Sequence, residues 1–173
     1  GPSRASPGST CNATLCGNAT PTQGYGVLFR DNATLDLHTA VVMGWFAGVD
    51  ASGSLPTPGF IPRSAFFNNA TNPLFVEDPA ETDPASPLFD DDNGFDELSW
   101  FNLPARFNRT TDQGIVSCYD PKSPKPWPAT SLTTNASTPP TDGFFDTTAR
   151  FLGAFRDPAD PWLTGTWARF DDK

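Results

Sequence analysis

The acidic segment "FDDDNGFDE", residues 89–97, has the residue types that could hold a metal ion. The candidate ligands are Asp90, Asp92, Asp96 and Glu97. Carboxylate oxygens are the hard ligands that Ca²⁺ prefers, and Gly94 allows a tight turn that could wrap several of them round one ion. The segment is not an EF-hand loop, because phenylalanine stands where that loop needs its glycine and its final glutamate. Calcium is therefore the candidate cofactor, and the alternative is a solvated loop that caps the following helix.

The residue types needed for nucleophilic catalysis are scarce. His38 is the only histidine, and the alternation in "TLDLHT" places it on the polar face of a predicted strand. No G-x-S-x-G motif occurs, and Cys118 lies in a proline-rich segment where nothing lowers the pKa of a thiol. Arg30, Arg63 and Arg106 could serve a polysaccharide lyase, but each is equally explained as a charge at a strand end. The sequence favours a non-catalytic protein and leaves open a polysaccharide-active enzyme.

Aromatic side chains offer a second kind of binding chemistry, because their faces can stack on sugars. Trp127 stands between two prolines and is the tryptophan that we expect to be exposed, so it is the candidate ligand-binding residue. The aromatic rings near the end of the chain are predicted to be core instead, since a chain with 19 prolines has few other large side chains to bury. These rings are Phe144, Phe151, Phe155, Trp162 and Trp167.

Charge and cysteine content exclude some classes of protein. The formal net charge of −9 repels nucleic acid and anionic lipid, and no stretch approaches the roughly 20 consecutive apolar residues of a transmembrane helix. Cys11 and Cys16 could form a disulfide that closes a short loop in an oxidising compartment, which would leave Cys118 unpaired. Three cysteines do not decide the pairing.

Asparagine sequons recur along the chain. The sequence N-x-S/T begins at Asn12, Asn18, Asn32, Asn69, Asn108 and Asn135. In a eukaryotic secreted protein these would be glycan sites. The composition is rich in Ala, Pro and Asp and poor in Lys, which looks bacterial, so we interpret the sequons as turn chemistry.

The pattern of short apolar runs predicts a mainly β fold. Residues 1–24 lack large apolar side chains and are expected to form a flexible arm, and residues 25–173 to form a single β-rich domain. Short strand candidates separated by Gly-rich and Asn-rich turns recur about every twenty or more residues, as in the rungs of a parallel β-solenoid. A β-sandwich would give similar strands and is the alternative.

Two other segments complete the predicted domain. Residues 77–97 form an acidic loop insertion, followed by about two helical turns near 95–102. We expect Asn93 or Asp92 to cap this helix, with its apolar side chains facing inward. The inward residues are predicted to be Phe95, Leu98 and Phe101 or Leu103. Residues 143–170 should form an irregular aromatic cap that covers one open end of the stacked rungs.

Four stretches occur in an order that resembles a family of secreted bacterial surface proteins. They are "GVLFRDNATLDLHTAVVMGW", "SAFFNN", "DDDNGFDE" and "DGFFDTTARFLGAFRDPADPWLTGTWARF". The similarity is to the C-terminal region of that family, which is mostly uncharacterised. It implies right-handed parallel β-helix rungs and an extracellular or cell-surface location. The family's N-terminal rungs have no counterpart in these residues, so we expect the first rung to pair with such rungs or with another copy of the chain.

Together these patterns predict a secreted or cell-surface module with a structural or adhesive role, stabilised by calcium. The alternative is the carbohydrate-binding part, or a fragment, of a polysaccharide-active enzyme. The expected partners are a glycan and another copy of the chain or further rungs, and not nucleic acid.

Overall fold

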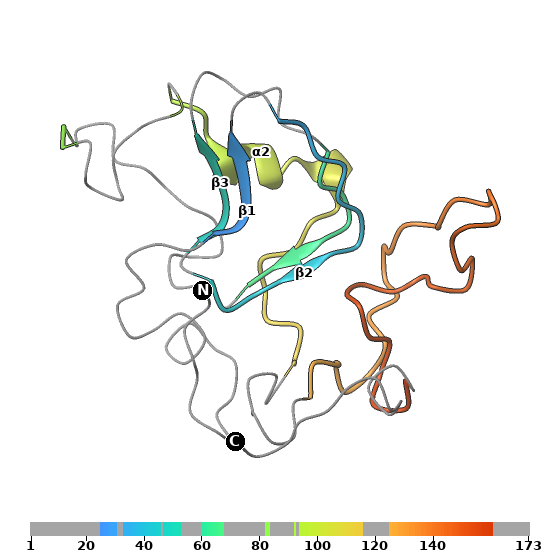
Figure 1. Cartoon of the computed structure of the whole chain (residues 1–173). Coiled ribbons are helices and arrows are strands. Elements are labelled where there is room, and N and C mark those ends of the chain that lie inside the picture. Colours follow the sequence, from blue (N-terminus) through green and yellow to red (C-terminus); the bar gives the residue numbers. More distant parts are fainter. Residues whose placement is uncertain are drawn as a thin grey trace, which may run out of the picture.

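A computed structural model describes residues 25–30, 33–45, 47–52, 60–67, 82–83, 92, 94–115 and 125–160 (Figure 1). Several predictions concern residues outside these ranges. They include the arm 1–24, most of the acidic insertion, Cys11, Cys16, Cys118, Asp90, Trp162 and Trp167.

The described part of the chain is mainly β-structure with little helix. Its elements are β1 (Tyr25–Arg30), β2 (Val41–Val42), β3 (Ala47–Ser52), β4 (Ala65–Phe66), α2 (Glu97–Phe101) and a 3₁₀ helix (Pro104–Arg106). The strands are short because glycine and proline interrupt every apolar run. This outcome confirms the predicted fold class at the level of mainly β, and it confirms the short helix near 95–102.

Both pairs of strands are parallel. β1 pairs with β3, where Val27 lies opposite Val49, and β2 pairs with β4, where Val41 lies opposite Ala65. The chain therefore returns to the same place after about two dozen residues. A further parallel bridge joins Ala65 to Arg109, so a third segment lies against the second. An immunoglobulin-like sandwich is built from antiparallel sheets instead.

The three stacked segments contain Thr39, Arg63 and Phe107, and each segment bends at that residue. We call this shared bend the corner. Thr39, Arg63 and Phe107 have φ angles of 54°, 54° and 55°, in the left-handed region that non-glycine residues seldom enter. They occupy matching positions, because the amide of Thr39 donates to the Pro62 carbonyl at 3.4 Å and that of Arg63 to the Arg106 carbonyl at 2.7 Å. These backbone bonds hold each corner in its strained conformation.

A ladder of polar side chains follows directly after this corner. The amide of Ala40 donates to Ser64 Oγ at 3.1 Å, and the amide of Ser64 donates to Asn108 Oδ1 at 2.9 Å. The amide group of Asn108 also donates to the carbonyls of Ile61 and Phe101 at 2.7 and 2.9 Å. Each segment thus satisfies backbone groups of its neighbour, which buried polar atoms require. The sequon residue Asn108 is bound inside the protein by all three of these contacts.

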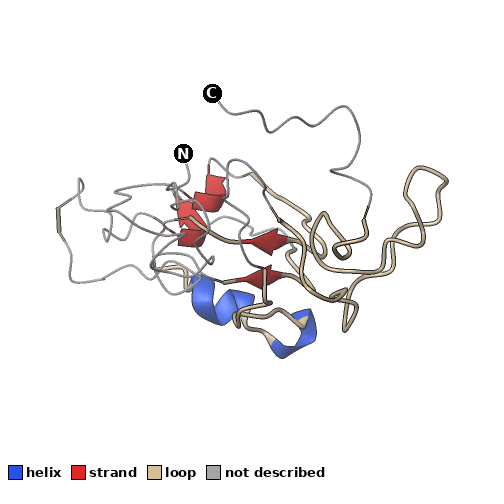
Figure 2. Cartoon of the chain, turned by 90° about the horizontal axis from the view of Figure 1, so that it is seen from below, coloured by secondary structure: helices blue, strands red, loops and turns tan. Residues whose placement is uncertain are grey.

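The larger core lies between the two strand pairs and α2. It contains Phe29, Val49, Ala51, Ile61, Phe66, Trp100 and Phe101. The ring of Trp100 meets Phe29 edge-on with centroids 5.8 Å apart, and Phe101 lies 4.7 Å from Phe66. The helices lie on one side of the strands (Figure 2). Aromatic packing of α2 therefore closes this core.

The details of α2 differ from the prediction. Its N-cap is Asp96, whose Oδ1 accepts from the amide of Ser99 at 2.8 Å, and not Asn93 or Asp92. Leu98 and Leu103 are exposed, and Trp100 and Phe101 face inward. The helix begins at Glu97, and this start sets which of its side chains reach the core.

The C-terminal segment, residues 125–160, packs against the outer face of the β2–β4 pair. A second core cluster joins Ala65, Phe67, Ile115 and Leu152, with Val41 and Met43 packed against it. Two arginines of the stack also bind this segment. Arg63 donates to the Asn135 carbonyl, and Arg109 donates to the Thr134 carbonyl. In Figure 1 the segment, drawn in orange, is loop throughout.

The described part of the aromatic cap is not buried in the way predicted. Phe144 is 85 % exposed, and its expected burial is therefore wrong, while Phe151 and Phe155 are half-buried. Leu152 is the buried residue instead, with its amide bound to the Leu132 carbonyl at 3.0 Å. The reason is local: Asp142 Oδ1 accepts from the amide of Phe144 at 3.0 Å, and this tight turn projects the ring outward.

Candidate functional site

Three of the four predicted calcium ligands are described, and they separate by burial. Asp92 and Glu97 are buried, whereas Asp96 is exposed and binds Ser99 through both carboxylate oxygens. Among the described residues, no three His, Cys, Asp or Glu side chains converge on one metal position. The structure thus brings Asp92 and Glu97 together and leaves Asp96 at the helix cap.

Asp92 and Glu97 form a buried carboxyl pair beneath β3. Glu97 Oε1 accepts from the amide of Ala51 at 3.0 Å, and Asp92 Oδ1 accepts from the amide of Phe95 at 2.8 Å. Burial, together with the neighbouring charge and side chain of Asp92, raises the pKa of Glu97 to about 9, although the Ala51 amide opposes the shift. Glu97 therefore keeps its proton at neutral pH. The pair joins α2 to β3.

An open groove of about 840 Å³ lies between the corner at Thr39 and the C-terminal segment. This volume is within the range of small-molecule and cofactor sites. Its walls combine aromatic rings with carboxylates, one histidine and one arginine. The lining includes Asp36, His38, Phe145, Asp146, Phe151 and Asp160.

His38 lies exposed at this groove, as its place in the sequence predicts. Its Nδ1 is 3.3 Å from Ser137 Oγ, and its ring meets Phe60 edge-on at 5.7 Å. In a catalytic triad, a carboxylate on the other nitrogen orients the imidazole. The hydrogen bond and the ring contact that His38 makes with described residues involve Ser137 and Phe60, and neither is a carboxylate. Sequence reasoning missed Ser137, because it lies 99 residues further along the chain.

A short turn and a neighbouring segment hold two carboxylates of the groove in place. Asp146 Oδ1 accepts from the amide and the hydroxyl of Thr148 at 2.8 and 2.7 Å, and these bonds lower the pKa of Asp146. Asp36 Oδ1 accepts from the amide of Phe60 at 3.2 Å. Each carboxylate keeps further acceptor capacity, because an ionised carboxylate has about four lone-pair positions.

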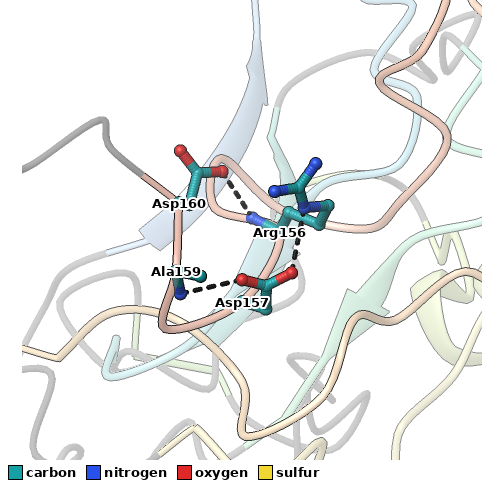
Figure 3. A network of polar contacts seen from close by, with 4 residues as sticks. All are labelled: Arg156, Asp157, Ala159 and Asp160. Atoms are coloured by element: carbon teal, nitrogen blue, oxygen red, sulfur yellow. Dashed lines mark hydrogen bonds and ion pairs between the residues drawn. The ribbon is translucent and has the colours of Figure 1, made fainter.

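A second turn beside the groove is formed by residues 156–160. Asp160 Oδ2 accepts from the amide of Arg156 at 3.0 Å, and Asp157 binds both Arg156 Nε and the amide of Ala159. Figure 3 shows how the two aspartates hold Arg156 from either side. The hydrogen bond from the Ala159 amide lowers the pKa of Asp157, so its charge persists at neutral pH. This turn fixes Arg156 and Asp160 at the groove wall.

The other predicted binding residues are engaged in packing. Trp127 is half-buried, meets Phe155 edge-on at 6.4 Å and is not among the residues that line the groove. Arg63 lies 4.8 Å from the centre of the Phe107 ring, and Arg106 lies 4.4 Å from that of a core tryptophan. Stacking of arginine on aromatic rings stabilises the corner.

Sequence reasoning missed Phe145 and Asp146 as groove residues. They follow Gly143 in "DGFFDTT", which belongs to the predicted aromatic cap of residues 143–170. The signal that could have exposed them is the repeated aspartate, because aspartate two residues before a donor forms a surface turn. Both Asp142 and Asp146 do so here.

The described part of the chain is mainly β-structure and carries an open groove. No family model, curated protein or solved structure matches this chain. The resemblance to the secreted bacterial surface proteins therefore remains a prediction from its motifs. Within the described ranges, no helix is long and apolar enough to cross a membrane.

Proposed function

We propose that this chain is a secreted or cell-surface module that acts in structure or adhesion without catalysing a reaction. Its body is a short right-handed parallel β-helix of the kind found in the bacterial surface proteins that its motifs resemble. The right hand follows from the handedness of parallel crossover connections. The C-terminal segment covers one outer face of this stack and carries the binding groove.

The observation that supports this proposal best is the shared corner of the three segments. The left-handed residues, the parallel pairing at Val41 and Ala65, and the ladder through Ser64 and Asn108 recur from one segment to the next. A stack of this kind is stable only when each layer contacts its neighbours, and it presents a long, rigid side surface. Such a scaffold suits display and adhesion.

A carbohydrate-binding part of a polysaccharide-active enzyme is the second candidate. The groove and the contact between His38 and Ser137 favour it. An assay for new reducing ends or unsaturated products on a panel of polysaccharides separates the two candidates. Turnover that is lost in His38→Ala would replace the adhesive proposal with the enzyme.

Adhesion itself is tested with beads that carry the full chain. We expect these beads to be retained on bacterial envelopes or on extracellular matrix, and beads that carry the heat-unfolded chain to be washed away. Equal retention of both kinds of bead on every surface would contradict the proposal.

Calcium and self-association belong to the same proposal. Thermal unfolding with and without millimolar Ca²⁺ should show a higher midpoint with the ion, and an unchanged midpoint removes calcium from the account. We also expect β1 to pair along its edge with another copy of the chain or with a further rung. Light scattering that shows a strict monomer would argue against pairing between copies.

A further inference from the structure

We propose that the groove binds a neutral polysaccharide chain, with Phe145 and Phe151 as the surfaces on which sugar rings stack and Asp146 as an acceptor for their hydroxyl groups. This inference rests on the proposed adhesive function and names its ligand class. It is carried by the residues that two distant parts of the chain bring to one groove.

The groove has a suitable size and two different walls. The corner contributes Asp36, His38 and Thr39, and the C-terminal segment contributes residues 137–140 and several residues between Phe145 and Asp160. About 840 Å³ is enough for a few sugar rings, because ligand sites of about 300–1,000 Å³ enclose a drug-sized molecule. The groove is open to solvent, and a site that binds an internal stretch of a long polysaccharide must be open.

The two phenylalanines supply apolar faces. Phe145 is 48 % exposed and lines the groove, and Phe144 meets it edge-on with ring centroids 5.0 Å apart. This contact limits the rotation of Phe145. Phe151 is half-buried on the same C-terminal wall. The C–H face of a sugar ring packs against aromatic carbon and removes this apolar surface from water.

The polar groups of the groove match hydroxyl groups. Asp36 and Asp146 are held by bonds to neighbouring amides and, as ionised carboxylates, have further acceptor positions for a ligand. Ser137 and His38 provide a hydroxyl and an imidazole beside them. Hydrogen bonds to a charged acceptor are stronger than those between neutral groups, so fixed carboxylates are effective partners for sugar hydroxyls.

Charge excludes the acidic polysaccharides. Three carboxylates face one arginine in this groove, and the guanidinium Nε of Arg156 already binds Asp157 at 2.9 Å. The whole chain carries a formal charge of −9. A uronate or sulfated chain would be repelled at close range. A basic peptide would be attracted by the same charge, and it is therefore one of the outcomes that the experiment distinguishes.

The experiment is an NMR titration of the full ¹⁵N-labelled chain with neutral hexasaccharides. The probes are the α-glucan, β-glucan, β-mannan and chitin hexamers. We expect one of them to shift the amides of residues 36–39 and 145–156 together, with a Kd between about 10 μM and 1 mM, as suits a weak site used many times along a polymer. Hexagalacturonate and hexalysine are titrated in parallel.

Matched aspartates provide the controls. Asp146→Asn keeps the turn oxygen and removes the charge at the groove, and it should weaken binding about threefold to tenfold. Asp142→Asn makes the same change in the same kind of turn, at a residue that does not line the groove, and should leave binding unchanged. Phe145→Ala should weaken binding about tenfold or more, as the loss of a stacking ring does. All three positions are exposed, and an unchanged thermal midpoint confirms that each variant is folded.

Several results overturn the inference. They are the absence of binding to every neutral hexamer, binding to hexagalacturonate or hexalysine alone, and equal loss of affinity in Asp142→Asn and Asp146→Asn. If Phe145→Ala beads still adhere as the wild type does, the glycan groove is wrong and the adhesive function stands. If the hexamer binds but no bead is retained, the groove stands and the adhesive function is wrong.

Discussion

Replacing Glu97 with glutamine should remove most of the decline in stability that we expect between mildly acidic and neutral pH. In the folded protein Glu97 is 3 % exposed, and its burial beside Asp92 raises its pKa from 4.5 to about 9. An acid with a raised pKa binds its proton in the folded state after the unfolded state has released it. Its contribution is therefore complete below the unfolded pKa, near 4.5, and is lost as the pH rises through the folded pKa, near 9.

The size of the change in stability follows from the difference between the folded and unfolded pKa of Glu97. One proton bound only by the folded state costs about 1.4 kcal/mol of unfolding free energy for each pH unit in that window. From pH 5.5 to 7.5 the wild type should thus lose about 2 to 3 kcal/mol that Glu97→Gln retains. Glutamine can still accept from the Ala51 amide and donate to Asp92, so the two proteins should be similar near pH 4.5.

Urea unfolding at five pH values measures this difference, and Asp112→Asn, a change at an exposed carboxylate, serves as the control. The difference between Glu97→Gln and wild type should widen with pH, while the control follows the wild type. Parallel curves for all three proteins would refute the reasoning, because they would show that Glu97 titrates alike in the folded and unfolded chains.

Further substitutions test the packing. Asn108→Ala removes the bonds to the Ser64 amide and to two carbonyls, and should lower the unfolding free energy by about 2 to 4 kcal/mol in urea titration; a cost below that of Asn102→Ala, at an exposed position, would contradict the ladder. Leu152→Ala should lower the unfolding free energy by about 2 to 5 kcal/mol, because Leu152 is buried. Phe144→Ala, at an exposed ring, should lower it by less than about 0.5 kcal/mol in the same measurement. The reverse order would favour the predicted buried aromatic cap. Gly26→Ala places a Cβ 2.2 Å from Val42 Cγ1 and should lower the thermal midpoint, since such overpacking costs about 1 to 3 kcal/mol; an unchanged midpoint would contradict the contact between the first strand and β2.

The sequence predicts the class of elements better than their contacts. Short apolar runs between turn residues were enough to indicate short strands, which are observed. The alternation in "TLDLHT" indicated an exposed His38, which is also observed, but the strand predicted there is only an isolated bridge at Asp36. The helix near 95–102 was also predicted, with Phe95 and Phe101 facing inward as observed, but its cap and the burial of Trp100 in place of Leu98 were not. Those depend on where the chain leaves the turn at Asp92, which the spacing of apolar residues does not determine.

The carboxylates and the aromatic tail show why composition alone misleads. Clustered acids suggest cation ligands, yet burial raises the pKa of Glu97 so that it stays protonated at neutral pH, and burial is a property of the fold. Phenylalanine favours the core on average, yet Phe144 follows an aspartate turn that points it outward. The groove was out of reach of sequence reasoning, because its walls come from parts of the chain about a hundred residues apart.

The claim on which the rest depends is that three segments of the chain stack in parallel at one corner. NMR couplings across hydrogen bonds test it most directly. They should link the amide of Ala65 to the Ala40 carbonyl, and the amide of Phe66 to the Arg109 carbonyl. The absence of both couplings in a folded sample, or antiparallel cross-strand contacts at Val41 and Ala65, would contradict the stack and the groove built upon it.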